Sequence, residues 1–201
     1  MNKYYILDFR IERDSYFAEN GKISDQKIIK LRNKGHSLRE ENINISFLKN
    51  EGKLLHQIDN LFSLPVVSQT ILNVLLQHCA NEVEFYQVKL NFETKLNYYF
   101  INILDNIDAI DYEKSKYVEL ASGIKILKEL SKLVLIDEVA SKRGIFRLKG
   151  FRLRIIVSNK VKEELAKLNL QELQFVPVED FQWKLGGYRL RDYGITSKDK
   201  G

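Results

Sequence analysis

The sequence predicts an α+β fold in which mixed, strand-rich sheets carry a few short helices. Two observations lead to this prediction. Residues 154–178 (RIIVSNKVKEELAKLNLQELQFVPV) follow a strand–helix–strand pattern. Most other apolar stretches are short, rich in β-branched and aromatic residues, and bounded by polar turns, which is typical of strands. Sheets should therefore contribute most of the core.

The unit at 154–178 begins with a β-branched strand that ends at Val157. Ser158 follows at the expected helix N-cap, where its hydroxyl can accept from a free N–H of the first turn. Asn169 is a plausible helix-ending residue, and Pro177 favours a sheet edge or a bulge for the second strand. The apolar face of the helix is predicted to consist of Val161, Leu165 and Leu168.

The same unit occurs at residues 64–88 (LPVVSQTILNVLLQHCANEVEFYQV), and an offset of 90 residues aligns the two segments without a gap. The identical positions fall at the cap and at predicted core-facing sites. They are Val67 and Val157, Ser68 and Ser158, Leu75 and Leu165, Glu82 and Glu172, Phe85 and Phe175, and Val88 and Val178. We interpret the pattern as an internal duplication that forms either two lobes or two halves of one fold.

The remaining stretches predict further short elements. In chain order they are a strand at 4–9, a short helix from Ser24 to Gly35, a weak strand at 43–48, a buried strand at 98–104, a turn at 111–115, a strand at 117–120, a strand or helix at 124–130, and a hairpin of strands 132–136 and 145–148 with a loop between them.

The chain divides most naturally into an N-terminal half at 1–92, a C-terminal half at 93–183, and a short hairpin or tail at 184–201. No Pro-rich or Gly/Ser-rich linker separates the halves. One compact domain is therefore also compatible with the sequence.

Composition limits the location and the partners. The single cysteine, Cys79, cannot form an internal disulfide, which favours a reducing compartment. The sequence shows neither a signal peptide nor 18 consecutive apolar residues, so we expect a cytoplasmic protein with no membrane partner. The net charge of +5 permits an acidic partner or nucleic acid without requiring either.

One acidic stretch could support catalysis. Asp105, Asp108 and Asp111 recur every third residue, and spaced carboxylates can bind a divalent cation or act as an acid–base pair. A solvated strand end and turn explains the same pattern. No phosphate-binding loop or nucleophile motif accompanies them, so we expect no cofactor, no metal and no enzymatic activity, and a hydrolase remains a minor alternative.

The basic stretch 143–154 (RGIFRLKGFRLR) offers another function. It interleaves basic and aromatic side chains, which can mean phosphate contacts and base stacking, as in a nucleic-acid-binding regulator. The alternation also has the period of two of a strand with one buried and one solvated face. Nucleic acid is accordingly the alternative partner and not the main one.

Three stretches together resemble a known family: residues 98–120 (YYFINILDNIDAIDYEKSKYVEL), 145–150 (IFRLKG) and 155–178. The positions that carry the resemblance are Lys114-Ser115 after an acidic turn, Phe146-Arg147 in a short strand, and the closing Leu173, Phe175, Pro177 and Val178. The chain resembles immunity protein family eleven of bacterial polymorphic toxin systems, formerly a domain of unknown function.

The resemblance implies a small cytoplasmic, non-enzymatic antitoxin that binds a cognate toxin domain and occludes its active site. No toxin-contacting residue follows from it. From the residues themselves, the candidate contacts are aromatics with no obvious place in the core: Tyr16, Phe17, Trp183, Tyr188 and Tyr193. Because the chain is basic overall, we expect the toxin to present an acidic or neutral face.

Overall fold

The computed structural model describes residues 3–9, 17–18, 35–41, 43, 45–47, 55–60, 64–119 and 127–184. These residues form three sheets and three α-helices, which confirms the predicted strand-rich α+β class. The predicted helix from Ser24 to Gly35 lies almost entirely outside the described residues. None of the helices in the described part is long and apolar enough to cross a membrane.

The first large sheet is five-stranded, in the order β13-β1-β12-β11-β8. Its strands are β1 (Tyr4–Phe9), β8 (Asn106–Ile107), β11 (Ile145–Leu148), β12 (Phe151–Ser158) and β13 (Leu173–Pro177). Helix α4 (Asn159–Ala166) connects β12 to β13. As predicted, Asn169 lies just after this helix in the left-handed region, at φ 52°, and Pro177 ends an edge strand.

The second large sheet is six-stranded, in the order β2-β4-β5-β7-β6-β3. Its strands are β2 (Phe17–Ala18), β3 (Ile45–Phe47), β4 (Gln57–Asn60), β5 (Val66–Ser68), β6 (Val83–Leu90) and β7 (Tyr98–Ile103). Helix α2 (Gln69–Cys79) connects β5 to β6. The predicted strands at 43–48 and 98–104 are therefore β3 and β7.

The repeated sequence pattern corresponds to a repeated topology. In each unit, two parallel strands joined by a helix flank one antiparallel strand, which is β1 between β12 and β13 and β7 between β5 and β6. The registers match as well, since Tyr5 pairs with Val157 where Tyr99 pairs with Val67. The central strand follows its own unit in the first copy but comes from the N-terminus in the second.

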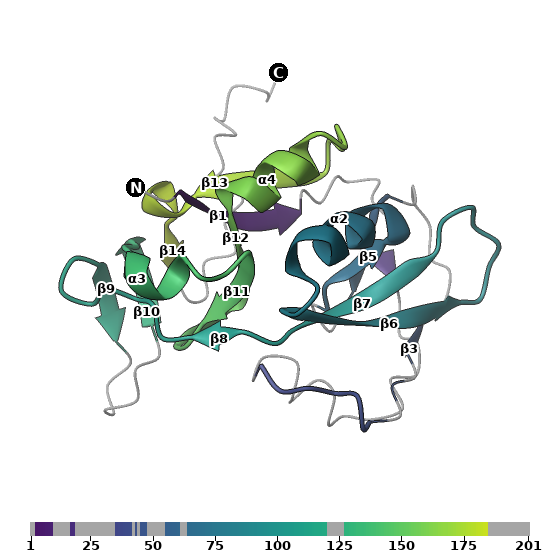
Figure 1. Cartoon of the computed structure of the whole chain (residues 1–201), viewed down its shortest axis with the longest axis horizontal. Coiled ribbons are helices and arrows are strands. Elements are labelled where there is room, and N and C mark those ends of the chain that lie inside the picture. The colour runs from purple at the N-terminus through teal and green to yellow at the C-terminus, as the bar shows by residue number, and fades with distance from the viewer. Residues whose placement is uncertain are drawn as a thin grey trace, which may run out of the picture.

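The two units share one hydrophobic core. Figure 1 shows α4 over the sheet that contains β1 and β12, and α2 over the sheet that contains β5 and β7, and the two helices contact each other. One buried cluster combines Ile71, Leu75 and Val83 of the first unit with Ile155 and Val161 of the second. Two further clusters cover the opposite faces of the two sheets. The proposed division at 1–92, 93–183 and 184–201 stays a prediction, although β1 pairs with strands of the second half.

The predicted hairpin of 132–136 with 145–148 is wrong. Strand β10 (Leu127–Lys132) pairs with β9 (Lys116–Glu119) and β14 (Trp183–Lys184) in a third sheet, while β11 pairs with β12 and β8. Residues 133–136 run beside the segment around Ile110, where Leu135 forms a bridge. The predicted loop after them contains α3 (Asp137–Ala140), whose two acidic residues favour a helix start.

Candidate functional site

Two equivalent glutamates connect the halves. Glu82 follows α2, and its carboxylate accepts from the N–H of Gly144 at 2.9 Å and of Ile145 at 2.6 Å, at the start of β11. Glu172 follows α4 and accepts from the N–H of His56 at 2.9 Å, immediately before β4. Glu82 of the first unit therefore anchors β11, which pairs with β12 of the second unit. Glu172 of the second unit anchors the chain before β4, which pairs with β5 of the first unit. The same structural role explains why both copies contain the glutamate.

The cap serines of the two copies behave differently. Ser158 Oγ accepts from the N–H of Val161 at 3.4 Å, which confirms it as the N-cap of α4. Ser68 occupies the N-cap position of α2 but makes no capping bond, contrary to the sequence prediction. Its hydroxyl is fully buried and lies 2.8 Å from Nδ1 of His56, so that imidazole takes the bond a cap would use.

The region beside Ser158 is open. A hollow of about 410 Å³ lies between the start of β1, the C-terminal end of α2, the turn at 141–144 and the N-terminal end of α4. Basic side chains dominate its lining, with one carboxylate among them: Lys3, His78, Glu82, Lys142, Arg143 and Lys160. The hollow is therefore a positively charged depression to which both halves of the chain contribute.

The charges of this hollow are not neutralised from within. The Glu82 carboxylate is held by two backbone N–H groups, and Arg143 forms an ion pair with Asp105. Within the described ranges, the side chains of Lys3, Lys142 and Lys160 have neither a hydrogen bond nor an ion pair. The same holds for Nε2 of His78, which is buried without a partner. An external anionic group would find donors here.

Cys79 is a buried free cysteine that lies next to Gly144, a residue in the lining of the hollow, and its thiol has low reactivity. A Cβ placed on Gly144 would stand 2.7 Å from its Sγ, so glycine permits this close approach. Burial first, and then the charge and hydrogen bond of Glu82, raise the pKa of the thiol to about 12. At neutral pH the thiol stays protonated, and it therefore packs in the core instead of acting as a nucleophile.

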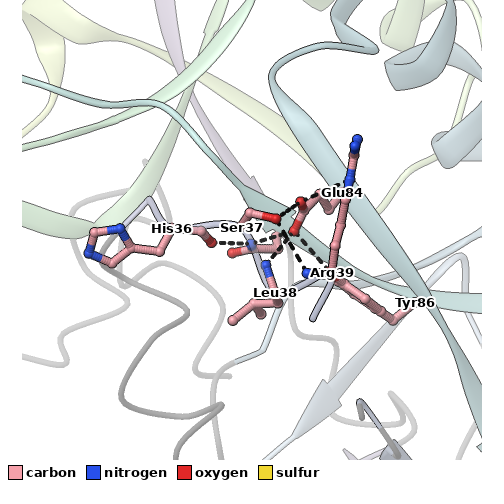
Figure 2. A network of polar contacts seen from close by, with 7 residues as sticks. His36, Ser37, Leu38, Arg39, Glu84 and Tyr86 are labelled. Atoms are coloured by element: carbon pink, nitrogen blue, oxygen red, sulfur yellow. Dashed lines mark hydrogen bonds and ion pairs between the residues drawn. The ribbon is translucent and has the colours of Figure 1, made fainter. Parts of the chain in front are cut away.

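A second buried carboxylate fastens the segment 36–39 to the six-stranded sheet (Figure 2). Glu84 on β6 accepts from the N–H of Leu38 at 2.8 Å and from the hydroxyl of Ser37. It also accepts from the Tyr86 hydroxyl at 2.8 Å and from Asn102 Nδ2 at 3.2 Å. A network this complete gives the segment a single docked position.

The charge of Glu84 is stabilised by these donors. Burial alone would raise the pKa of its carboxyl, but the hydrogen bonds from Leu38, Ser37, Tyr86 and Asn102 lower it below its usual value. Arg39 adds an ion pair at 3.3 Å from a side chain that is 78% exposed, against 5% for Glu84. The carboxylate is thus ionised, and its role here is to anchor the segment.

The three aspartates of the acidic stretch have different surroundings. Asp105 pairs with Arg143, and Asp111 accepts from the backbone and side chain of Lys114, which lowers the pKa of Asp111. Within the described residues, no three His, Cys, Asp or Glu side chains could hold a metal ion together. Asp108 is exposed. Residues 111–115 form a turn, as the sequence predicts.

The basic stretch differs from its predicted alternation. All four residues of β11 are buried, including Arg147 at 4% exposure, because β11 lies inside the sheet and core clusters cover both faces. Arg154 pairs with Asp8 and lies over the ring of Phe181. The predicted row of solvated basic side chains is therefore wrong for β11, and the nucleic-acid alternative loses one of its main contacts.

The structure describes two of the five candidate aromatic contacts, Trp183 and Phe17. Trp183 is partly buried and packs edge-on against Phe151, with ring centroids 5.2 Å apart. Phe17 lies in β2, and Tyr16, Tyr188 and Tyr193 lie outside the described residues. Their role in partner binding stays a prediction.

Sequence reasoning missed one exposed aromatic. The sequence repeat predicts that Phe85 faces the core, but its side chain is 45% exposed and packs edge-on against Tyr99. Its neighbour Val83 does reach the shared core, so only part of β6 is covered on this side. Strand periodicity alone cannot show where such a cover ends.

The described residues combine three features. Two topologically equivalent units share a core, structural carboxylates hold them together, and residues of both units line a basic hollow. The model of the immunity protein family Imm11 matches residues 6–180, so the chain belongs to that family. No curated protein matches the chain.

The residues that carried the resemblance have structural contacts. Lys114 closes its turn through Asp111 at 2.7 Å, and Ser115 Oγ accepts from the N–H of Val134 at 3.0 Å. Phe146 on β11 is fully buried and belongs to a hydrophobic core cluster. The described contacts of these positions support the fold.

Proposed function

We propose that this protein is an antitoxin of a polymorphic toxin system that binds its cognate toxin domain and occludes the active site of the toxin. The observation that carries the proposal is the family match over residues 6–180. The protein acts without catalysis or a cofactor, in the cytoplasm of the cell it protects.

The physical features of the chain suit a stoichiometric inhibitor. Occlusion requires a rigid surface, and the two units are held to each other by a shared core and by the carboxylates of Glu82 and Glu172. A stable complex buries roughly 800 Å² on each partner. Such a footprint spans roughly 20–30 residues, so it needs several elements of this scaffold and not one motif.

Co-expression with the toxin domain encoded beside this chain tests the proposal. We expect growth to be restored, and we expect the two proteins to elute as one complex from a sizing column. An inactive toxin variant, used as a control, allows binding to be measured without selection against the toxin. A toxin that still kills while the proteins elute separately would contradict the proposal.

Titration distinguishes occlusion from an enzyme that reverses the toxin's effect. Occlusion predicts that toxin activity in vitro falls linearly and reaches zero near one equivalent of this protein. Protection at a small fraction of an equivalent would instead indicate turnover and would refute the non-catalytic mechanism.

A further inference from the structure

We propose that the basic hollow between α2, α4 and the turn at 141–144 is a docking surface for acidic side chains of the toxin. The inference rests on the proposed function and specifies which surface of this chain is used and the chemistry of the group it receives. It follows from the charge of the hollow and from a comparison of the two halves.

The first half has the same backbone frame, but its serine has a different environment. In the second half, the N–H of Ser158 donates to the carbonyl of Gly144 at 2.9 Å. In the first half, the N–H of Ser68 donates in the same way to the carbonyl of His56 at 2.7 Å. In the first half the serine hydroxyl is then buried against the His56 ring. In the second half Ser158 borders an open, basic depression. The same backbone frame thus holds a fully buried serine in one half and a serine beside an open depression in the other.

The charge of the open form suits an anionic partner. Four basic side chains, Lys3, Lys142, Arg143 and Lys160, line the hollow against the single carboxylate of Glu82. That carboxylate is directed to the backbone of the other half, and three of the four cations have no ion pair among the described residues. Like charges gathered in this way repel one another, and a carboxylate placed between them relieves that repulsion and accelerates encounter.

A protein carboxylate fits the hollow better than a nucleic-acid backbone. The hollow is a discrete depression of about 410 Å³, whereas a nucleic acid needs a track of cations along its phosphates. Arg147, which could have extended such a track along β11, is buried. An aspartate or glutamate side chain, or two of them, would occupy the depression as an anchor, and the rest of the interface would surround it.

The experiment compares two double charge reversals. Lys142→Glu with Lys160→Glu alters the hollow, and Lys89→Glu with Lys95→Glu is the matched control, since these lysines are also exposed and unpaired among the described residues. Lys89 lies on β6, and Lys95 lies in the connection from β6 to β7. This connection contacts the N-terminal end of α2, which is roughly 15 Å along the helix from the end that borders the hollow. Both variants change the net charge equally.

Affinity for the inactive toxin domain is then measured at low and moderate salt. We expect the hollow variant to bind at least about 100-fold more weakly and the control to stay within about threefold of the unaltered protein, with the difference shrinking as salt rises. Circular dichroism and thermal unfolding check the fold. Position 160 lies in the first turn of α4, where glutamate is favourable, and Lys142→Gln with Lys160→Gln provides a milder second variant.

The outcomes separate the two proposals. If the unaltered protein does not bind the toxin, the proposed function fails. If it binds and the hollow variant binds equally well, the docking surface is wrong while the function stands. Loss of RNA or DNA binding in the hollow variant, with toxin binding unchanged, would also overturn the inference.

Discussion

Removing the Glu84 carboxylate tests how this residue stabilises the protein. Its buried hydrogen bonds should contribute much more to the free energy of unfolding than its ion pair with Arg39 does. In Glu84→Ala, the buried N–H of Leu38 loses its acceptor, and the buried amide of Asn102 loses one of its two acceptors while it keeps the His36 carbonyl. Each unsatisfied buried donor costs about 1–3 kcal/mol, so the substitution should cost about 3–5 kcal/mol of unfolding free energy. That is a large part of a typical stability of about 5–15 kcal/mol.

Arg39→Ala removes the other partner of the same ion pair and is the matched control. Because the Arg39 side chain is 78% exposed, its loss should cost at most about 1 kcal/mol. Urea unfolding followed by circular dichroism gives both free energies, and hydrogen exchange of the Leu38 amide shows whether the segment 36–39 opens locally. Equal costs for the two variants, or a cost below about 1 kcal/mol for Glu84→Ala without faster exchange at Leu38, would refute the assigned role.

The same carboxylate predicts a pH dependence. The hydrogen bonds to Glu84 lower its pKa in the folded state below the unfolded value of about 4.3, against the opposing effect of burial. Its contribution is therefore complete above roughly pH 5 and is lost as the pH falls through the folded pKa. The stability advantage of the unaltered protein over Glu84→Gln should shrink between about pH 7 and pH 3. An advantage that stays constant across this range would contradict the assignment.

Two further predictions concern the connection between the halves and the buried thiol. Glu82→Ala should destabilise the protein more than Glu172→Ala in urea unfolding, by about 1–2 kcal/mol, because two backbone donors and not one lose their acceptor. The reverse order would show that the number of backbone donors does not set the cost. Cys79, with its pKa raised to about 12, should react with iodoacetamide at about pH 8 roughly three orders of magnitude more slowly in the folded than in the urea-unfolded protein, and similar rates would show that the thiol is accessible.

The fold class and the repeated unit could be predicted because their signals are local. A cap serine, a helical apolar stripe and a β-branched strand each depend on neighbouring residues, so Ser158, Val161 and Leu165 behave as the pattern indicated. Ser68 satisfies the same local pattern, yet it bonds His56, twelve positions earlier in the chain. Local chemistry placed this residue correctly, and tertiary contact decided its partner.

The pairing of strands could not be read in the same way. The central strand of the second unit is β1, which lies about 150 residues from its partner β12. One signal existed, because Tyr4-Tyr5 and Tyr98-Tyr99 begin the two central strands and pair with equivalent residues. Proximity in the sequence favours a hairpin of 132–136 with 145–148, and this prediction is wrong. In the structure Leu135 forms a bridge with Ile110, and β11 pairs with β12.

The hollow has no sequence signature for a physical reason. Lys3, His78, Lys142 and Lys160 come from four separate elements, and each is unremarkable beside its neighbours. What distinguishes the site is a difference between the duplicated halves. In one glutamate–backbone–serine frame a fully buried serine bonds a partly buried histidine, and the other frame ends in Gly144 beside exposed lysines. A duplicated fold can keep one copy of a local frame for stability and leave the other free to acquire a partner. A charge reversal at Lys142 and Lys160 should therefore weaken toxin binding at little cost in stability, whereas Glu172→Ala should lower stability with little direct effect on the affinity of the folded protein.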